Sequence, residues 1–237
     1  MTTFEERQLL RQSVAALVSK HATSEANRRA MDSVTGYDEA LWSMLCEQVG
    51  VAALVVPEEI GGAGGELADA AAVLEELGRA LVPTPLLGTT LAELALLAAD
   101  EPDGETIERL AAGTAIGAVV FDRDYVINGD VADVVLAVDD ARIVRWAEVS
   151  IAAAHTLDPT RRLARVTPGA CTTIGNDPGI ADTASILLAA EQVGAAARCL
   201  ELTVEYTKQR VQFGRPIGSF QALQHRMADM FIECQLA

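Results

Sequence analysis

Apolar residues recur at a helical period through the first part of the chain, from Thr3 to about Leu110. A helix is predicted from Asp38 to Gln48, with Gly50 as its C-terminal cap. Another helix is predicted from Leu67 to Leu81, where prolines at 83 and 85 end it. Before these two helices, near the start of the chain, the apolar residues at helical spacing are Phe4, Leu9, Leu10, Val14, Leu17 and Val18.

The pattern changes between about Gly113 and Gly179, where short β-branched runs are separated by turn residues. Asn128-Gly129, between YVI and VADVVLAV, predicts a hairpin turn. The sequence RRLARVTP predicts another strand, and NDPG ending at Gly179 predicts a turn. We therefore expect a small antiparallel β-domain here.

The last part of the chain is helical again. A long helix is expected from Ile186 to Gln209, in which Gly194 and the alanines at 195–197 would let a neighbouring helix approach closely. FGRPIG then breaks the helix, and a second helix follows to form an antiparallel hairpin. The residues expected to face inward on the second helix are Phe220, Leu223, Met227, Met230, Phe231 and Cys234.

These patterns predict an α+β fold that is mostly α. The expected domains are an N-terminal helical domain (1–112), a central β-domain (113–179) and a C-terminal helical hairpin (180–237). Half of the residues are hydrophobic, which is enough for a substantial core, and only 4% are aromatic, which favours close-packed helices.

Charge and cysteine usage narrow the possible functions. The chain has 18 Lys and Arg against 34 Asp and Glu, a net charge of −16, which argues against nucleic-acid binding. The four cysteines lie far apart, which argues against a disulfide framework or a zinc site. Neither a signal peptide nor a membrane-spanning run is visible, so a soluble, cytoplasmic protein is expected.

Several possible motifs are weak. GGAGG, which starts at Gly61, matches neither a dinucleotide fingerprint nor a P-loop, and a flexible loop explains it better. His21, His155 and His225 lack metal-ligand spacing, so no metal site is predicted. No serine lies in a nucleophile elbow, and nothing indicates a hydrolase.

The segment YTKQRVQFGRPIGSFQALQHRMADM gives a stronger indication of a ligand-binding site. Arg210 ends a long helix and Gln221 begins the return helix, so both would lie at the tip of a hairpin. A guanidinium fork suits pyrophosphate oxygens. The alternative is an ordinary turn between helices, in which Phe213 caps its own core, and these residues alone leave both interpretations open.

This segment closely resembles the flavin-contacting hairpin of acyl-CoA dehydrogenases. Their Tyr-x-x-x-Arg-x-Gln-Phe-Gly-x-Pro-Ile-x-x-Phe-Gln signature is met without a mismatch by Tyr206, Arg210, Gln212, Phe213, Gly214, Pro216, Ile217, Phe220 and Gln221. AAEQVG and ADM in the same region also resemble the family. Looser resemblances upstream are VPEEIGGAGG, LEELGR and LDPTRRLARV.

The resemblance implies an oxidoreductase of lipid metabolism, with FAD and an acyl-CoA thioester as ligands. In the family a glutamate removes the α-proton, and the flavin accepts a hydride from the β-carbon. The hairpin of one subunit supplies Arg and Gln to the phosphates of its neighbour's flavin. This implies cofactor-binding roles for Arg210 and Gln221, with Phe213 near the adenosine and Gln212 beside them.

The chain departs from the family in its expected catalytic residues. It ends at Ala237, within the second helix of what would be a C-terminal bundle, before the usual catalytic glutamate. The other position used for the base falls near Ala184 and Ser185, which cannot abstract a proton. Glu191 lies two turns further along, on a charged stripe that indicates a structural role. No catalytic residue is therefore predicted.

The flavin pocket also differs, because VVFDRDYVING replaces the Thr-Glu-Pro-x-x-Gly-Ser-like stretch of the family. We therefore expect a flavoprotein subunit that contributes FAD contacts to a partner in a homo- or hetero-oligomer. The alternative is a structural or assembly subunit without flavin or CoA. A helical acyl-CoA-binding module is less favoured, because the preserved motif serves flavin.

Overall fold

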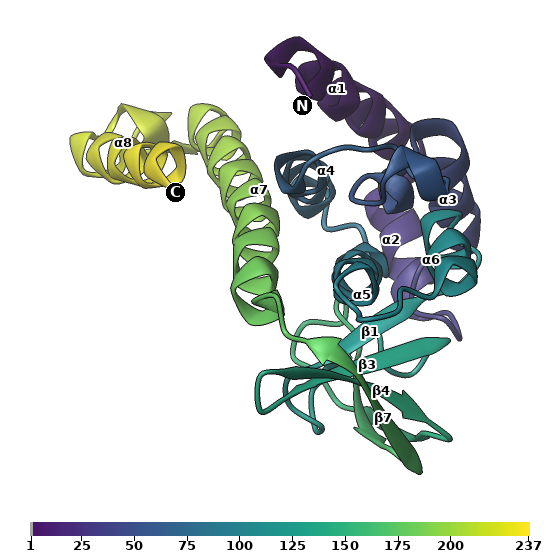
Figure 1. Ribbon diagram of the computed structural model, residues 1–237. Helices are drawn as coiled ribbons and strands as arrows, with labels where there is room; N and C mark the ends of the chain where they lie inside the picture. Colours follow the sequence, from purple (N-terminus) through teal and green to yellow (C-terminus); the bar gives the residue numbers. More distant parts are fainter. Residues whose placement is uncertain (1) are drawn as a thin grey trace.

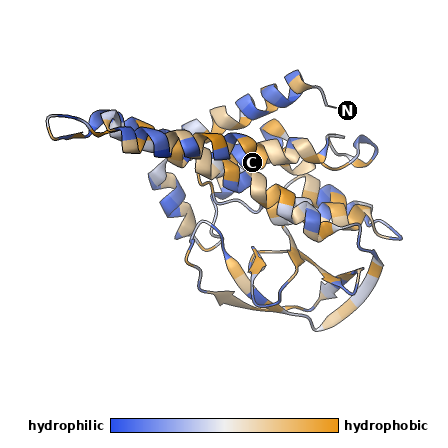
Figure 2. Ribbon diagram, turned by 90° about the vertical axis from the view of Figure 1, so that its left-hand side faces the viewer, coloured by the Kyte–Doolittle hydropathy of each residue, from blue (hydrophilic) through white to orange (hydrophobic). Residues whose placement is uncertain are grey.

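The computed structural model describes residues 2–237. The strands of residues 117–176 form two small sheets in a layer below the helices (Figures 1 and 2). The helices are α1 (Phe4–His21), α2 (Ser24–Met31), α3 (Glu39–Met44), α4 (Leu67–Arg79), α5 (Leu86–Leu97), α6 (Gly104–Ala111), α7 (Ile180–Gln209) and α8 (Gln221–Leu236). This arrangement confirms the expected α+β, mostly α fold class. The division into three domains remains a prediction.

The strands between α6 and α7 form two sheets, with orders β1-β3-β4-β7 and β2-β6-β5. Their bounds are β1 (Gly117–Val120), β2 (Val126–Ile127), β3 (Val134–Asp139), β4 (Arg142–Ala147), β5 (Ser150–Ala154), β6 (Leu163–Thr167) and β7 (Ala170–Asn176). Pairing is antiparallel except between β1 and β3, which run parallel. The predicted strand in RRLARVTP is present as β6.

The predicted hairpin at Asn128-Gly129 is wrong. Asn128 does adopt a left-handed backbone, with φ of 52°. However, β2 on one side pairs with β6, whereas β3 on the other side pairs with β1 and β4 in the second sheet. The hairpin lies instead between β3 and β4, where Asp140 and Ala141 both have positive φ, as a tight two-residue turn requires.

Local signals place the helix ends of the N-terminal part. The Asp38 carboxylate accepts hydrogen bonds from the amides of Ala40 and Leu41, each at 3.0 Å, so α3 begins where the sequence predicts. α3 continues into a π-helical turn (Leu45–Val49), and Gly50 ends it with φ of 75°. The glycine cap at this position is confirmed.

The helices α4 and α7 approach each other closely at two glycines. A Cβ built on Gly78 would lie 2.1 Å from the Glu191 carbonyl oxygen, and one on Gly194 would lie 1.9 Å from the Glu75 carbonyl oxygen. The two backbones therefore touch where only glycine fits. This confirms that Gly194 admits a neighbouring helix. Ala196, on the same helix, is exposed.

A chain of ion pairs runs beside this crossing and links α1, α4 and α7. In order, its members are Glu75, Arg11, Glu76, Arg79, Glu201 and Arg198. The hydrogen bond from Arg79 holds the pKa of the Glu201 carboxyl below its ordinary value. Glu201 is therefore ionised at neutral pH and connects α4 to the outer half of α7.

The return helix α8 is more exposed than its pattern predicts. Leu223, Met227 and Cys234 are half-buried, and Met230 and Phe231 are 39% and 55% exposed. Met227 and Phe231 nevertheless line a groove between α8 and α7, on the side where the sequence places them, whereas Met230 is not part of that lining. The exposure arises because α8 packs against the outer end of α7, away from the N-terminal helices (Figure 1). An apolar face of the hairpin is left open.

One carboxyl lies in the main core without a partner. Glu93 of α5 is fully buried, and neither of its oxygens forms a hydrogen bond within residues 2–237. Burial raises the pKa of Glu93 well above its ordinary value of 4.5. Burial also raises the pKa of the nearby Cys46 thiol to about 12. Both groups are therefore uncharged in the folded protein.

Stability is expected to depend on pH through Glu93. The folded chain keeps a proton that the unfolded chain releases, so the free energy of unfolding should fall as the pH rises from about 5 to about 8. Glu93→Met removes the unpartnered polar group and should raise that free energy by about 1–3 kcal/mol at the higher pH, and by less at the lower pH. Urea unfolding at both pH values measures this effect. Glu108→Met, at an exposed position of α6, is the control. An identical pH slope in wild type and Glu93→Met would contradict the expectation.

Candidate functional site

The residues expected to contact a cofactor meet at the outer end of α7. Arg210 caps α7, a short hairpin follows with β8 (Val211–Gln212) and β9 (Arg215–Pro216), and Gln221 begins α8. We call this region, residues 210–221, the hairpin tip. It lies with α8 apart from the N-terminal helices (Figure 1).

Local backbone chemistry shapes the tip. Phe213 and Gly214 form the turn of the small hairpin, with φ of 52° and 76°. The Ile217 amide donates to the Arg210 carbonyl at 2.8 Å and closes the base of the hairpin. The Phe213 and Phe220 rings meet edge to face, with centroids 6.1 Å apart. The sharp turn predicted at Phe213-Gly214 is present.

Phe213 does not cap a core. Its side chain is 91% exposed, although its edge touches Phe220. The sequence reasoning missed Arg215, whose guanidinium stacks 4.1 Å over the Phe220 ring. The basic position within FGRPIG is the signal that could have indicated it.

The side chains of the tip are available to a ligand. Within residues 2–237, neither Arg210 nor Gln212 nor Gln221 forms a side-chain hydrogen bond or ion pair. Residues 206–230 contain four Lys or Arg and one Asp, in a chain of net charge −16. The tip is thus a basic segment on an acidic protein.

The first turn of α8 adds backbone donors to these side chains. Its N-cap, Phe220, has no side-chain group that can bond the first amides, and the turn carries no acidic residue. Free amides and the helix dipole favour a negative group at such an end. Arg210, Gln221 and this helix end therefore fit the phosphates of a dinucleotide such as FAD.

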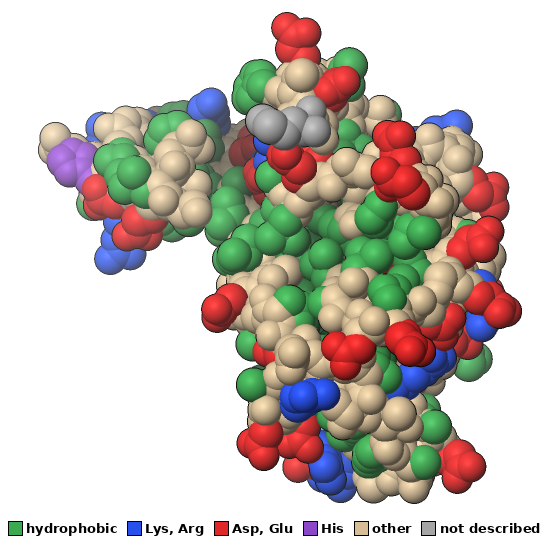
Figure 3. All heavy atoms as spheres, viewed as in Figure 1, with side chains coloured by type: hydrophobic (Ala, Val, Ile, Leu, Met, Phe, Trp, Pro, Cys, Tyr) green, Lys and Arg blue, Asp and Glu red, His purple; other side chains and the backbone are tan. Residues whose placement is uncertain are grey.

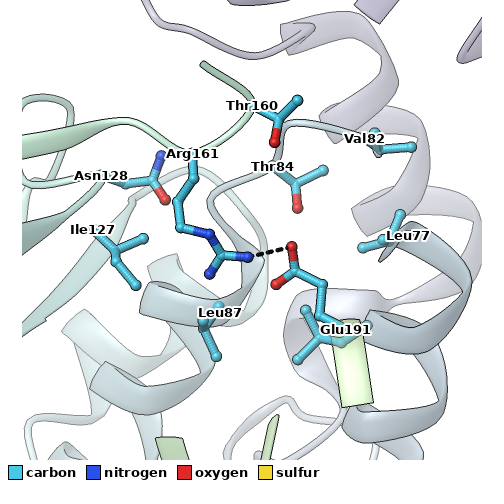
Figure 4. Close-up of a pocket in the computed structure, with 10 residues that line it drawn as sticks. Leu77, Val82, Thr84, Leu87, Ile127, Asn128, Thr160, Arg161 and Glu191 are labelled. Atoms are coloured by element: carbon cyan, nitrogen blue, oxygen red, sulfur yellow. Dashed lines mark hydrogen bonds and ion pairs between the residues drawn. The ribbon is translucent and has the colours of Figure 1, made fainter. Parts of the chain in front are cut away.

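A second concave region, which we call the crevice, lies where the end of α4, the strands between α6 and α7, and α7 meet. It has a volume of about 390 Å³. Arg161 donates to Glu191 at 2.6 Å, and this pair also lines a smaller neighbouring pocket, which Figure 4 shows. The sequence singled out neither this crevice nor a role for Arg161. The ion pair agrees with the structural role expected for Glu191.

The crevice does not fit a whole FAD. The only cation of its lining, Arg161, is paired with Glu191, and a second carboxylate, Asp158, lies in the same lining. The local charge is therefore −1, which repels two phosphates. The one glycine of the lining, Gly78, packs against α7 and forms no phosphate-binding loop. Of these two regions, only the hairpin tip has residues that suit the phosphates of FAD.

The start of α7 carries no free carboxylate at the position considered for a base. Ala184 is half-buried, and the Ser185 hydroxyl donates to the Ala181 carbonyl at 2.9 Å. No group of three or more metal-ligating side chains occurs in residues 2–237. In the same range, no helix is long and apolar enough to cross a membrane.

Comparison with known proteins identifies the family. The model described as "Acyl-CoA dehydrogenase, N-terminal domain" matches residues 4–114, and the model described as "Acyl-CoA dehydrogenase, C-terminal domain" matches residues 182–237. Acyl-CoA dehydrogenase IpdE2 of Mycobacterium tuberculosis is 66% identical over 232 residues, which cover 98% of this chain and 73% of that protein.

Solved structures share the whole fold. A chain of the ChsE4-ChsE5 complex from Mycobacterium tuberculosis is 26% identical with a TM-score of 0.82, over 99% of this chain and 75% of that one. At the level of fold alone, an acyl-CoA dehydrogenase complexed with FAD from Bacillus anthracis has a TM-score of 0.82 at 18% identity, over 98% of this chain and 49% of that one. With two family models spread over both helical parts and a relative two-thirds identical along almost the entire length, the chain belongs to the acyl-CoA dehydrogenase family.

Proposed function

We propose that this chain is a flavin-contacting subunit of an oligomeric acyl-CoA dehydrogenase, and that its hairpin tip binds FAD held mainly by a neighbouring subunit. The observation that carries the proposal is the unpaired Arg210 beside the open N-terminus of α8, on a segment that lies apart from the N-terminal helices. The crevice of the same chain has a net negative lining, which does not suit the phosphates of the cofactor.

Each residue of the tip has a distinct task in this proposal. Arg210 would hold the pyrophosphate, because its planar fork suits a pair of phosphate oxygens. Gln221 and the first amides of α8 would donate to the other phosphate oxygens. The exposed ring of Phe213 would serve the adenosine, with Gln212 beside it. When bound, FAD supplies the acceptor for the hydride that leaves the β-carbon of an acyl-CoA thioester.

The catalytic base comes from outside the residues described. Ala184 carries no proton acceptor, and the Ser185 hydroxyl is bonded to its own helix. Glu191 is held by Arg161 at 2.6 Å, so it is not free to take a proton from a substrate. The subunit therefore positions the cofactor, and a carboxylate elsewhere in the assembly removes the α-proton.

A related chain supports an assembly of different subunits, since the ChsE4-ChsE5 structure is a complex of two named proteins. A broad hydrophobic area bordered by acidic side chains covers part of the helical face (Figure 3), and exposed apolar side chains also line the hairpin helices. Areas of this kind usually contact a partner. A cytoplasmic location is part of the proposal.

The chain by itself is expected to show no acyl-CoA dehydrogenase turnover. Loss of a positioned base lowers a rate by about 10²- to 10⁴-fold. The test is to compare the isolated chain with the complex obtained by affinity purification from cells that produce it, by sedimentation, flavin absorbance and acyl-CoA oxidation. Flavin and turnover should appear only in the complex.

Two outcomes would count against this proposal. Turnover at ordinary enzyme rates by the isolated chain would show that it carries its own base. A complex without flavin would favour the alternative, a structural subunit.

A further inference from the structure

The hairpin tip contains a second arginine, Arg215, beside the residues assigned to FAD. Arg215 is exposed, and within residues 2–237 its side chain forms no hydrogen bond or ion pair. Its guanidinium lies instead over the Phe220 ring, 4.1 Å from the ring centroid. An aromatic ring attracts a cation without using its N–H donors. Arg215 is therefore a positioned cation whose hydrogen-bond donors are available to a ligand.

The register of the small hairpin places Arg215 on the same face as Arg210. Gln212 of β8 pairs directly with Arg215 of β9. Paired residues of an antiparallel ladder project to one face, and so do residues two apart along an extended strand. Arg210 has an extended backbone and its carbonyl accepts from the Ile217 amide at 2.8 Å, so the ladder continues to it. Arg210, Gln212 and Arg215 thus share one face of the hairpin.

Phe220 connects this face to the beginning of α8. It is the N-cap of that helix, and its carbonyl accepts from the amides of Leu223 and Gln224 at 3.0 Å and 3.1 Å. The helix therefore fixes the backbone that carries the ring. Because the guanidinium of Arg215 stacks on this ring, it is held next to Gln221 at the start of α8.

The charges of the tip match those of FAD when Arg215 is included. Each of the two phosphates of FAD carries a negative charge, whereas Arg210 supplies one positive charge and the glutamines supply none. Arg215 supplies a second positive charge on the same face, and residues 206–221 contain no Asp or Glu. The remaining cation of this range, Lys208, lines the groove between α7 and α8.

We propose that Arg215 is a second cationic contact for the phosphates of FAD, and that Phe220 is the positioning residue that holds its guanidinium. The proposal rests on the proposed function, because it concerns the same flavin of a neighbouring subunit. It adds that retention of this flavin depends on two guanidinium groups of the tip.

The test is titration of the dialysed complex with FAD at about 0.05 M and about 1 M salt. Arg215→Ala should weaken FAD binding at least about fivefold at the lower concentration, and by a smaller factor at the higher one, because salt screens the contact. Arg215→Leu keeps an apolar group against Phe220 without the charge and should bind FAD as weakly. Arg215→Lys keeps the charge and should restore part of the affinity.

Two further variants separate a specific contact from its surroundings. Phe220→Leu leaves the charge of Arg215 but removes the ring, so it should weaken FAD binding by a smaller factor and keep the salt dependence of the wild type. Arg226→Ala is the control for overall charge, because Arg226 is exposed in the second turn of α8 and forms no ion pair within residues 2–237. It should change the affinity by less than about twofold.

The variants also distinguish this proposal from the proposed function. Wild-type affinity in Arg215→Ala, together with a loss in Arg210→Ala, would overturn the role of Arg215 alone. Wild-type affinity in Arg215→Leu, or a loss in Arg215→Ala that is equal at both salt concentrations, would show that Arg215 merely supports Phe220 and would overturn it too. Wild-type affinity in both alanine variants would remove the proposed function as well.

Discussion

Replacing Arg210 with alanine is expected to lower the affinity of the purified complex for FAD by at least about tenfold. A charge-assisted bond from arginine to phosphate contributes about 1.5–3 kcal/mol, and about 1.4 kcal/mol corresponds to a factor of ten. The fold should not change, because the Arg210 side chain forms no hydrogen bond or ion pair within residues 2–237. Its backbone carbonyl, which bonds Ile217, is kept in the variant.

The measurement is flavin absorbance per protein after extensive dialysis, followed by titration with FAD. Arg28→Ala is the matched control, because Arg28 is an exposed arginine on α2 that forms no ion pair within residues 2–237, and its loss changes the net charge equally. Arg210→Lys should restore only part of the affinity, because an ammonium cannot form two parallel bonds.

Full flavin retention by Arg210→Ala would show that the hairpin tip is an ordinary turn between helices and does not bind flavin. The structural-subunit alternative would then replace the proposed function. Equal loss in Arg28→Ala would instead indicate that overall charge, rather than the guanidinium fork, governs retention.

Replacing Gly194 with alanine is expected to lower the free energy of unfolding by about 3 kcal/mol, toward the upper end of the cost of overpacking. The added Cβ would lie 1.9 Å from the Glu75 carbonyl oxygen and 3.1 Å from the Arg79 nitrogen, both backbone atoms of α4. No rotamer change relieves this contact, so α4 and α7 must separate. Helix propensity alone predicts a change of the opposite sign, a gain of about 1 kcal/mol.

Gly104→Ala is the matched control for this prediction. Gly104 is the exposed first residue of α6, and nothing lies within 4 Å of a Cβ built on it. Thermal unfolding should show a fall of about 6–12 °C for Gly194→Ala and none for Gly104→Ala. A stabilised Gly194→Ala protein would show that α4 and α7 do not meet at this distance.

The two predictions concern the middle and the outer end of one helix, α7. α7 has 30 residues and is therefore about 45 Å long, so a small change in its direction moves the hairpin tip by a larger distance. The contact at Gly194 and the ion pair between Arg79 and Glu201, 2.6 Å apart, both fix that direction. Gly194→Ala is thus expected to weaken flavin binding as well as stability.

The sequence alone determined those features whose interactions are local. The start of α3 at Asp38 and the end of its π-helical continuation at Gly50 depend on hydrogen bonds and backbone angles within a few residues. The hairpin tip likewise depends on contacts within residues 210–221, which is why its turn at Phe213-Gly214 could be predicted from the motif.

Only the tertiary structure decided which distant segments meet. Asn128 bends the chain as expected, but its flanking strands join different sheets, because strand partners depend on how both sheets pack. Glu93 is buried by side chains from other parts of the chain. The ion pair between Arg161 and Glu191 joins two elements that lie far apart in sequence, and so does the crevice beside it. Neither residue spacing nor helical period encodes such contacts, since each depends on where the opposite side chain lies once the core has formed.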